Sequence, residues 1–163
     1  MNKSFLLIGG NEGDILASLA RARENIGISA GLIRRASSLY RTAPWGRTDQ
    51  PDFINQALAV DTTLGAQPLL AALLEIEERM GRKRLEKWAS RIIDIDILFF
   101  NDDMVDQPGL RIPHPEIQNR RFALAPMEEI APAHIHPILG RSIRELLAEC
   151  PDQGNVKRIT AII

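Results

Sequence analysis

Short apolar runs and helical stripes of apolar residues alternate along the first part of the chain. Lys3–Gly9 is an apolar run that ends in glycines, a pattern that predicts a buried strand. A helix is expected to follow, with Asp14 placed to cap its first turn and Gly27 and Gly31 marking its end. Its predicted inward stripe comprises Leu16, Leu19, Arg23 and Ile26, of which Arg23 is the one charged member.

Two further strands are predicted in the middle of the chain, and a second helix follows them. Leu32–Thr42 and Phe53–Thr63 contain β-branched and aromatic residues, and a loop at Ala43–Asp52 joins them. The next helix is expected from Gln67 through Met80, with Pro in its first turn, where a backbone N–H has no partner within the helix. Its apolar stripe is Leu69, Leu73, Ile76 and Met80.

The strand predicted at Ile92–Phe100 separates two kinds of side chain by its alternation. Because successive residues of a strand point to opposite faces, Asp94 and Asp96 share one face. Ile92 and Leu98 are expected beside the two carboxylates. The opposite, core face is expected to hold Ile93, Ile95, Ile97 and Phe99.

The order of these elements indicates the fold class. Strand, helix, strand, strand, helix, strand is the ferredoxin-like split βαβ arrangement, an α+β fold with a mostly antiparallel sheet and two helices on one face. C-terminal additions are expected after a Pro-rich segment: helices near Arg121–Ile130 and Ser142–Glu149, and a last strand at Val156–Ile163. No linker or repeat interrupts the pattern, so residues 1–163 are expected to form one domain.

Composition narrows the class of protein. The 163 residues are 45% hydrophobic and 25% charged, with a net charge of −1, as in ordinary globular proteins. Near neutrality argues against a nucleic-acid binder, and no apolar stretch is long enough to span a membrane. A single cysteine, Cys150, excludes an intramolecular disulfide and suits a reducing compartment, so a cytoplasmic location is expected. No feature points to an obligate protein partner.

The Asp94-Ile95-Asp96 triplet is the sharpest candidate for chemistry. Two carboxylates at this spacing have Cα atoms about 6.6 Å apart on one strand face, close enough to hold one hard cation or two. Mg²⁺ is the natural candidate. The alternative is that each aspartate pairs with a neighbouring arginine on a solvated sheet face.

A cluster of cations precedes the two aspartates. Arg82, Arg84 and Arg91 are placed to meet phosphate oxygens by bidentate contacts that lysine does not reproduce. Carboxylates facing arginines are what a magnesium-bound polyphosphate needs. The segment that carries them has the length and charge of a lid over phosphates, and the alternative is a solvated charged loop.

Four aromatic residues fall in or beside loops. Trp45, Phe53, Trp88 and Phe122, together with Asn55, would make a slot in which a flat heterocycle stacks while an amide reads its edge. The alternative for each aromatic is that it caps an edge of the core.

The glycine-rich turn and the histidines complete the candidate chemistry. Gly9–Asp14 lacks the Lys-Ser/Thr ending of a P-loop and the G-x-G-x-x-G spacing, so it is interpreted as a tight turn with a helix cap. His114 is a candidate phosphate donor, although a lone loop histidine is more often a surface residue. His134 and His136 lack the nearby cysteine or acidic partner that would favour a metal site.

Taken in order along the chain, these segments resemble those of the 6-hydroxymethyl-7,8-dihydropterin pyrophosphokinase family, which acts in folate biosynthesis. One matching block would be little evidence, whereas seven in family order are specific. The blocks are Leu7–Asp14, Ser38–Pro44, Asp49–Ala57, Glu75–Glu77 with Gly81-Arg82, Trp88 with Arg91–Leu98, Pro113–Pro115 with Arg120–Leu124, and Glu129–Pro132.

The resemblance implies a reaction and a ferredoxin-like fold. The β,γ-diphosphate of ATP would pass to the hydroxymethyl oxygen of a reduced pterin, leaving AMP. Asp94 and Asp96 would hold two Mg²⁺ ions that bridge the ATP phosphates, and Arg82 and Arg91 would act on a mobile catalytic loop.

The resemblance also implies two sets of binding residues. Phe53 and Phe122 would sandwich the pterin ring, while Asn55 and the backbone near Thr42 read its edge. The expected pterin-binding set is Thr42, Ala43, Pro44, Trp45, Phe53, Asn55, Trp88 and Phe122. The expected nucleotide-binding set is Glu77, Arg84, His114 and Arg120.

The chain departs from the family pattern at several positions. Ala89-Ser90 stands where the family has Gly-Pro, so the turn has lost the fixed φ of proline, and Gly10 replaces a common serine. Two other functions remain open. One is a different Mg²⁺-dependent phospho- or nucleotidyltransferase on the same fold, and the other is a non-enzymatic pterin- or nucleotide-binding domain.

Overall fold

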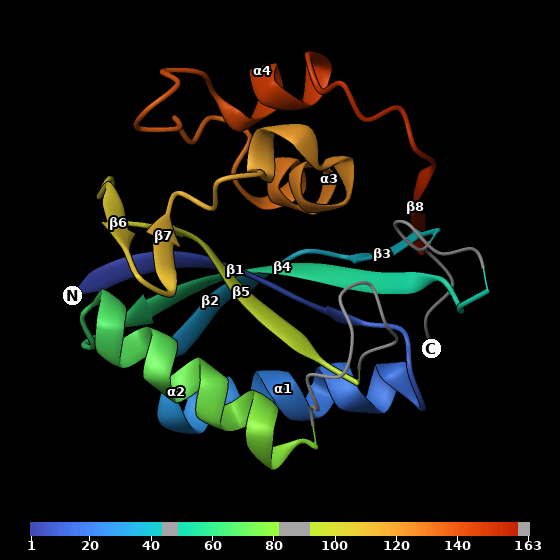
Figure 1. The fold of residues 1–163 in the computed structure, drawn as a ribbon, viewed down its shortest axis with the longest axis vertical. Helices are drawn as coiled ribbons and strands as arrows, with labels where there is room; N and C mark the ends of the chain where they lie inside the picture. The colour runs from blue at the N-terminus through green and yellow to red at the C-terminus, as the bar shows by residue number, and fades with distance from the viewer. Residues whose placement is uncertain (44–48, 82–91, 160–163) are drawn as a thin grey trace.

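Two pairs of helices lie on opposite sides of one antiparallel sheet (Figure 1). The computed structural model describes residues 1–43, 49–81 and 92–159. Within that part of the chain, no helix is both long and apolar enough to cross a bilayer. The helices are α1 (Ile15–Ser29) and α2 (Ala66–Arg79) on one side, and α3 (Arg121–Ile130) and α4 (Ile143–Ala148) on the other.

The sheet follows the predicted element order, and all of its neighbouring strands are antiparallel. Its order is β5-β1-β4-β3-β8, with β2 also paired to β4. The ferredoxin-like core is therefore confirmed, and the chain after it adds helices to the second face and a strand to one edge. The strands are β1 (Asn2–Gly10), β2 (Leu32–Ala36), β3 (Leu39–Thr42), β4 (Phe53–Thr62), β5 (Asp94–Phe100) and β8 (Val156–Ile159).

The single strand expected at Leu32–Thr42 is instead two strands, because Ser37 and Ser38 interrupt it. The Ser37 N–H donates to the Ala57 carbonyl of β4, and the Ser37 hydroxyl accepts from the Ala57 N–H, each at 2.9 Å. The hydroxyl thus accepts a hydrogen bond that a backbone carbonyl would accept in a regular strand pair. Since β3 and the Arg35–Ala36 end of β2 pair with β4 in registers that differ by one residue, the break is a local insertion of the bulge type.

The larger apolar core lies between the sheet and the pair α1 and α2. In α1 the predicted inward Leu16 is 46% exposed, whereas Ala22 is fully buried, so the stripe is rotated relative to the prediction. Arg23 does reach the sheet, where its guanidinium donates to Oε1 of the buried Gln56 at 2.8 Å. The α2 stripe is confirmed, with Leu69, Leu73, Ile76 and Met80 all buried.

A second core lies between the sheet and the pair α3 and α4. Phe99 packs in this core, although the alternation of β5 predicted it on the face of Ile97. The pairing of β5 with β1 skips Leu98, and this bulge inverts the alternation beyond it. The prediction for Phe99 is therefore wrong, and the face that carries Asp94 and Asp96 continues into an apolar core.

The Pro-rich segment contains a hairpin that the pattern did not predict. Strands β6 (Val105–Gln107) and β7 (Leu110–Ile112) pair antiparallel around a two-residue Pro108-Gly109 loop. Gly109 has φ of 78°, in the left-handed region that glycine enters without strain. A 3₁₀ turn at Ile117–Asn119 then leads into α3.

Candidate functional site

One face of the sheet collects predicted site residues from three strands. Gly9 of β1 lies opposite Asn55 of β4 on one side and opposite Asp94 of β5 on the other, so the three residues form one row. Thr42 and Phe53 lie opposite each other on β3 and β4, at positions of the same parity. Residues predicted separately for a metal and for a heterocycle therefore share the face on which α3 packs.

Gly9 is required by the closeness of Asn55. A Cβ on Gly9 would overlap the Asn55 side-chain oxygen and would lie 2.9 Å from the Ile54 carbonyl oxygen. The predicted helix cap is confirmed, since the Asp14 carboxylate accepts a hydrogen bond from the first turn of α1. Gly9 itself belongs to a strand, however, and its role is to admit a side chain from the neighbouring strand.

The Asp94 and Asp96 side chains are half-buried on neighbouring rows of this face. Over residues 1–43, 49–81 and 92–159, no group of three or more His, Cys, Asp and Glu gathers to hold a metal. Protein ligands alone would thus leave a cation under-coordinated. Two carboxylates completed by water and phosphate oxygens are, however, the donor set by which Mg²⁺ is usually held, so the residues fit this ion.

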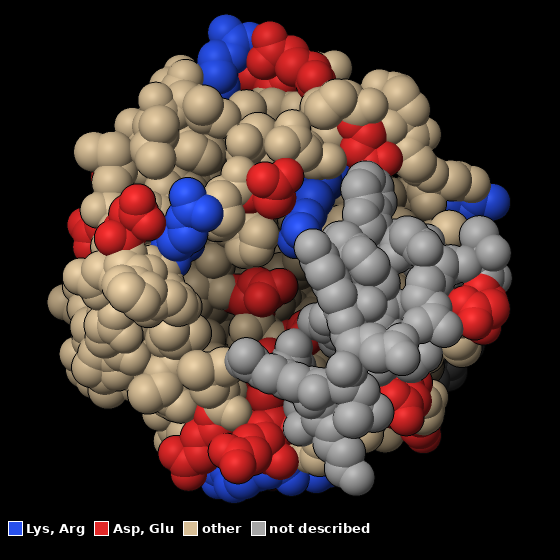
Figure 2. Space-filling view, viewed as in Figure 1, with Lys and Arg blue, Asp and Glu red and all other residues tan. Residues whose placement is uncertain are grey.

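Charged side chains of both signs surround this part of the surface (Figure 2). The face seen there is hollowed near its centre, where β5 passes in the view of Figure 1. Acidic side chains line the hollow, and a basic side chain stands at its rim. This mixture of charge suits a polyanion that carries its own cations.

Four predicted site residues converge on a small pocket where β5 meets the start of α3. The pocket is lined by Asp96, His114, Arg120 and Phe122, over an apolar floor. The Arg120 guanidinium carbon lies 5.7 Å from the centroid of the Phe122 ring, a cation–π distance. The volume is only about 10 Å³, room for a single water-sized group. Two larger hollows, of about 440 and 370 Å³, contain none of the predicted residues.

His114 is held at its backbone and at one ring nitrogen. Its backbone N–H donates to the Leu98 carbonyl at 3.0 Å, and its ring Nδ1 accepts from the Glu116 N–H at 3.2 Å. A neutral imidazole that accepts at Nδ1 carries its proton on Nε2, where it is a donor. Burial, assisted by the positive charge of Arg120, lowers the pKa of His114 to about 4. His114 is therefore a neutral hydrogen-bond donor at pH 7.

Glu77 lies on the opposite side of β5 from this pocket. Its side chain is buried, and Oε2 accepts from the Ile95 N–H at 2.6 Å. Because β5 is an edge strand, this contact fastens α2 to the strand segment between Asp94 and Asp96. The nucleotide-binding role that the resemblance implies for Glu77 stays a prediction.

The side-chain hydroxyl of Thr42 is buried. Its Oγ1 finds no hydrogen-bond partner among the described residues. Buried polar atoms are paired in the great majority of cases, so this hydroxyl is a candidate ligand contact. Ala43, which follows it, is exposed.

Asn11 is a residue of the site region that the sequence did not reveal. Its amide Nδ2 donates to Oε1 of Gln50 and to the Pro51 carbonyl, both at 3.0 Å. These contacts join the end of β1 to the segment that enters β4 at Phe53. Asn11 lies in the glycine-rich turn and in the first block of the family resemblance, Leu7–Asp14, but neither gave it a role.

Several predictions fall outside the described residues, among them the interpretation of the basic segment as a lid. The predicted site residues concerned are Pro44, Trp45, Arg82, Arg84, Trp88 and Arg91. His134 and His136 lie within the described residues, and both make contacts inside the protein. The His134 ring lies 4.5 Å from that of Phe99, and the His136 Nδ1 accepts from two backbone N–H groups.

Comparison with known sequences finds a matching family model and several similar proteins. Residues 5–132 match the family model for 7,8-dihydro-6-hydroxymethylpterin-pyrophosphokinase (HPPK). A 2-amino-4-hydroxy-6-hydroxymethyldihydropteridine pyrophosphokinase from Methylorubrum extorquens is 40% identical over 160 residues, which cover 98% of this chain and 99% of the relative. Proteins of the same name from Synechocystis (41% over 143 residues, 87% and 73% covered) and Pseudomonas aeruginosa (40% over 146 residues, 85% and 90% covered) are similar.

Solved structures share the fold. The HPPK-DHPS protein of Plasmodium falciparum matches 91% of this chain with a TM-score of 0.76 and 19% identity in its wild-type form with STZ-DHP. The wild-type form with pteroate gives a TM-score of 0.77 at the same identity. This chain spans 43% and 44% of those two longer chains.

Proposed function

Because the chain belongs to the 7,8-dihydro-6-hydroxymethylpterin-pyrophosphokinase family, we propose that it transfers the diphosphate of ATP to 6-hydroxymethyl-7,8-dihydropterin. The hydroxymethyl oxygen attacks the β-phosphorus. The bond from that phosphorus to the oxygen bridging the α-phosphate breaks, and the hydroxyl proton is lost. The products are AMP and the pterin diphosphate, which serve folate biosynthesis.

One observation carries the proposal: residues suited to a flat heterocycle and residues suited to a metal-bound polyphosphate share one sheet face. Asn55 and Asp94 are separated only by Gly9, which has no side chain. A heterocycle on Asn55 and a phosphate chain at Asp94 would therefore be neighbours above Gly9. Transfer between two bound substrates depends mainly on such proximity.

At the pterin end, we assign stacking to Phe53 and Phe122 and recognition of the ring edge to Asn55 and Thr42. The support is geometric. Asn55 is buried with its amide over Gly9, and the Thr42 hydroxyl lacks a partner among the described residues. Further pterin contacts are assigned to Ala43, Pro44, Trp45 and Trp88.

At the phosphate end, we assign two Mg²⁺ ions to Asp94 and Asp96. When bound, the ions would neutralise charge on the ATP phosphates and so favour displacement at phosphorus. His114 would donate from Nε2 to a phosphate oxygen, and Arg120 would add positive charge beside it. The remaining proposed phosphate and nucleotide contacts are Glu77, Arg82, Arg84 and Arg91.

No covalent nucleophile is needed from the protein in this reaction. Phosphoryl-type transfer is accelerated by alignment and by neutralisation of charge, which carboxylate-held metal and basic side chains supply. Both substrates are small molecules. The lone, buried Cys150 suits a reducing compartment, and we place the reaction in the cytoplasm.

The test is incubation with Mg²⁺ and ATP, with and without 6-hydroxymethyl-7,8-dihydropterin, followed by phosphorus NMR. The expected result is AMP that appears only with the pterin, together with a new diphosphate ester and no free pyrophosphate. ADP would indicate ordinary phosphoryl transfer, and free pyrophosphate would indicate nucleotidyl transfer. Pterin binding without loss of ATP would identify a binding domain, and each of these three results would overturn the proposal.

A further inference from the structure

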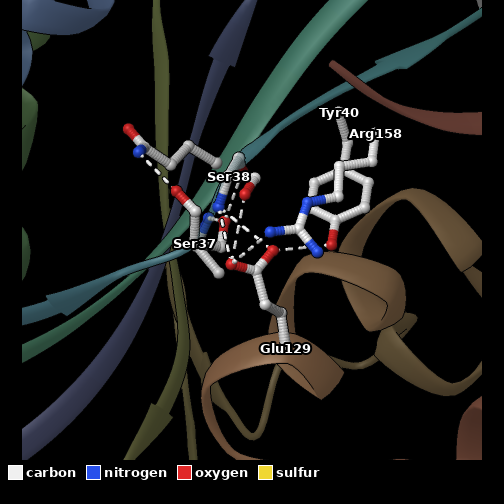
Figure 3. Close-up of polar contacts among 7 residues, drawn as sticks. Ser37, Ser38, Tyr40, Glu129 and Arg158 are labelled. Carbon is white, nitrogen blue, oxygen red and sulfur yellow. Dashed lines mark hydrogen bonds and ion pairs between the residues drawn. The ribbon is translucent and has the colours of Figure 1, made fainter. Parts of the chain in front are cut away.

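A single carboxylate ties α3 to two strands of the sheet (Figure 3). The Glu129 side chain of α3 accepts hydrogen bonds from the Ser38 N–H at 3.0 Å, the Ser38 hydroxyl at 3.2 Å and the Tyr40 hydroxyl at 2.7 Å. Arg158 of β8 lies beside it, with an N···O distance of 3.7 Å. Glu129 therefore accepts from the residue that precedes β3 and from β3 itself, and it lies beside a cation of β8.

At neutral pH, Glu129 is an ionised acceptor and Tyr40 is a protonated donor. Burial raises the pKa of Glu129, but the hydrogen bonds from Tyr40 and Ser38 and the charge of Arg158 outweigh it, so the pKa is lowered. Burial and the bond to Glu129 raise the pKa of Tyr40, which remains a protonated donor. Because charge-assisted hydrogen bonds are about twice as strong as neutral ones, Glu129 is a firm attachment of α3 to the sheet.

The attachment lies next to the row of site residues. Tyr40, which donates to Glu129, is directly opposite Asn55 in the pairing of β3 with β4. Two residues further along β3, Thr42 is opposite Phe53. Phe122, the aromatic residue of α3, lies on the same helix as Glu129, about two turns earlier. Of the two walls proposed for the pterin, Phe122 lies on α3, which Glu129 joins to β3, and Phe53 lies on β4, which pairs with β3.

We propose that Glu129 is a positioning residue for pterin binding, which holds α3 at a fixed height and rotation over β3 and β4. The inference rests on the proposed function. Stacking of one flat ring tolerates little change in the gap between its walls, so a loosened α3 weakens the contact of Phe122 on one side of the ring without moving Phe53 on the other. Asp94 and Asp96 lie on β5 and His114 follows β7, so Glu129 does not hold these phosphate-end residues in place. Arg120, at the start of α3, is the proposed phosphate contact that shares the helix with Phe122.

The test is the pair of variants Glu129→Gln and Tyr40→Phe, in the full-length chain. Glu129→Gln keeps the shape but replaces one acceptor oxygen by an NH₂ group that faces N–H and O–H donors. Tyr40→Phe removes a single hydroxyl and carries the test if Glu129→Gln does not fold. The matched control is Ser142→Ala, which removes the side-chain cap of α4 and lowers stability without touching this cluster.

The measurements are the dissociation constants of the pterin and of Mg²⁺-ATP, the melting temperature, and pterin-dependent AMP formation. We expect Glu129→Gln to bind the pterin about tenfold more weakly, and to weaken ATP binding by no more than about threefold, since Arg120 is the proposed phosphate contact carried by α3. Tyr40→Phe should weaken pterin binding by a smaller factor. The double variant should bind the pterin as well as Glu129→Gln alone, because the two substitutions remove the same interaction. Ser142→Ala should lower the melting temperature and leave both affinities unchanged.

Three outcomes would overturn the inference. Equal weakening of pterin and ATP binding, or an effect matched by Ser142→Ala, would mean that Glu129 only stabilises the fold. Unchanged pterin affinity in Glu129→Gln, with an active wild type, would mean that the position of α3 does not matter for the pterin. A wild type that binds no pterin would refute the proposed function together with this inference.

Discussion

The two faces of the sheet are built from the same strands, yet they differ in what covers them. Under α1 and α2 the face is mostly apolar, and its buried polar groups are paired within the protein, as Gln56 is with Arg23 of α1 and Glu77 of α2 is with the Ile95 N–H. Under α3 and α4 the face is apolar only in part, and beyond the core it presents Asn55, Asp94 and Asp96. A sealed face supplies stability, and a partly covered one supplies rigid polar groups that a ligand can reach. Substitutions at neighbouring residues of one strand should therefore affect either activity or stability, depending on the face to which the side chain points.

The largest effect is expected from Asp96→Asn, on the partly covered face. Loss of one carboxylate leaves phosphate and metal charge uncompensated, so turnover should fall by about 10²- to 10³-fold. The melting temperature should stay close to that of the wild type, because the side chain is only half-buried. Pterin-dependent AMP formation and thermal unfolding are the measurements. Wild-type turnover in a natively folded variant would remove the metal assignment.

Ile97→Ala, on the sealed face of the same strand, should show the opposite pattern. Ile97 is buried, and truncation of a buried isoleucine to alanine costs about 2–5 kcal/mol. Turnover per folded molecule should be retained at a temperature where the variant is still native. Denaturant unfolding and activity on the same sample measure the two quantities. If a folded Ile97→Ala sample lost activity as Asp96→Asn does, the two faces would not be separable.

Gly9→Ala should weaken pterin binding by about tenfold, because the new Cβ displaces the Asn55 side chain. Gly27→Ala is the matched control. Gly27 lies in α1 with open space around it, so alanine there should stabilise the protein by about 0.5–1 kcal/mol and leave pterin affinity unchanged. Fluorescence titration of the pterin measures the affinity. Wild-type affinity in Gly9→Ala would show that Asn55 does not read the ring.

The smallest effect concerns the protonation of His114. Its pKa of about 4 lies below the ordinary value of 6.5, so between these values an unfolded chain binds the proton and the folded chain does not. The contribution of His114 to stability is therefore complete above about pH 6.5 and is lost as the pH falls toward 4. Arg120→Gln should raise the pKa of His114 but leave it below 6.5, because burial is the larger cause. NMR titration of His114 measures its pKa in the wild type and in Arg120→Gln. A pKa near 6.5 in the wild type would contradict the buried geometry.

Periodicity was enough to predict most of the fold, because the buried stripes of α2 and the strands of the sheet follow local spacing. The interruption at Ser37 and the position of Phe99 were not predictable in this way. Both arise from how one strand pairs with another, at a bulge where a residue is skipped. The β6–β7 hairpin was missed because two strands of three residues each leave too short a pattern.

For the site, too, some residues could be predicted from local spacing and others could not. Asp94 and Asp96 were candidates from their spacing, and Asn55 and Phe122 were candidates for a heterocycle slot from the aromatic residues in loops. The specific ligands, ATP phosphates and a pterin, came from the resemblance to a family. Gly9 and Asn11 act through contacts with residues about forty or more positions away, at Asn55, Gln50 and Pro51. No local pattern carries such information.

The bond between Glu77 and the Ile95 N–H has a consequence for how the protein behaves in a crowded solution. An edge strand with open N–H groups is a template on which a second chain can add a strand and begin to aggregate. Here a buried carboxylate occupies the outward N–H of β5 at the middle of the Asp94–Asp96 segment. The strand that carries the proposed metal ligands is thus shielded at that point from the backbone of another molecule.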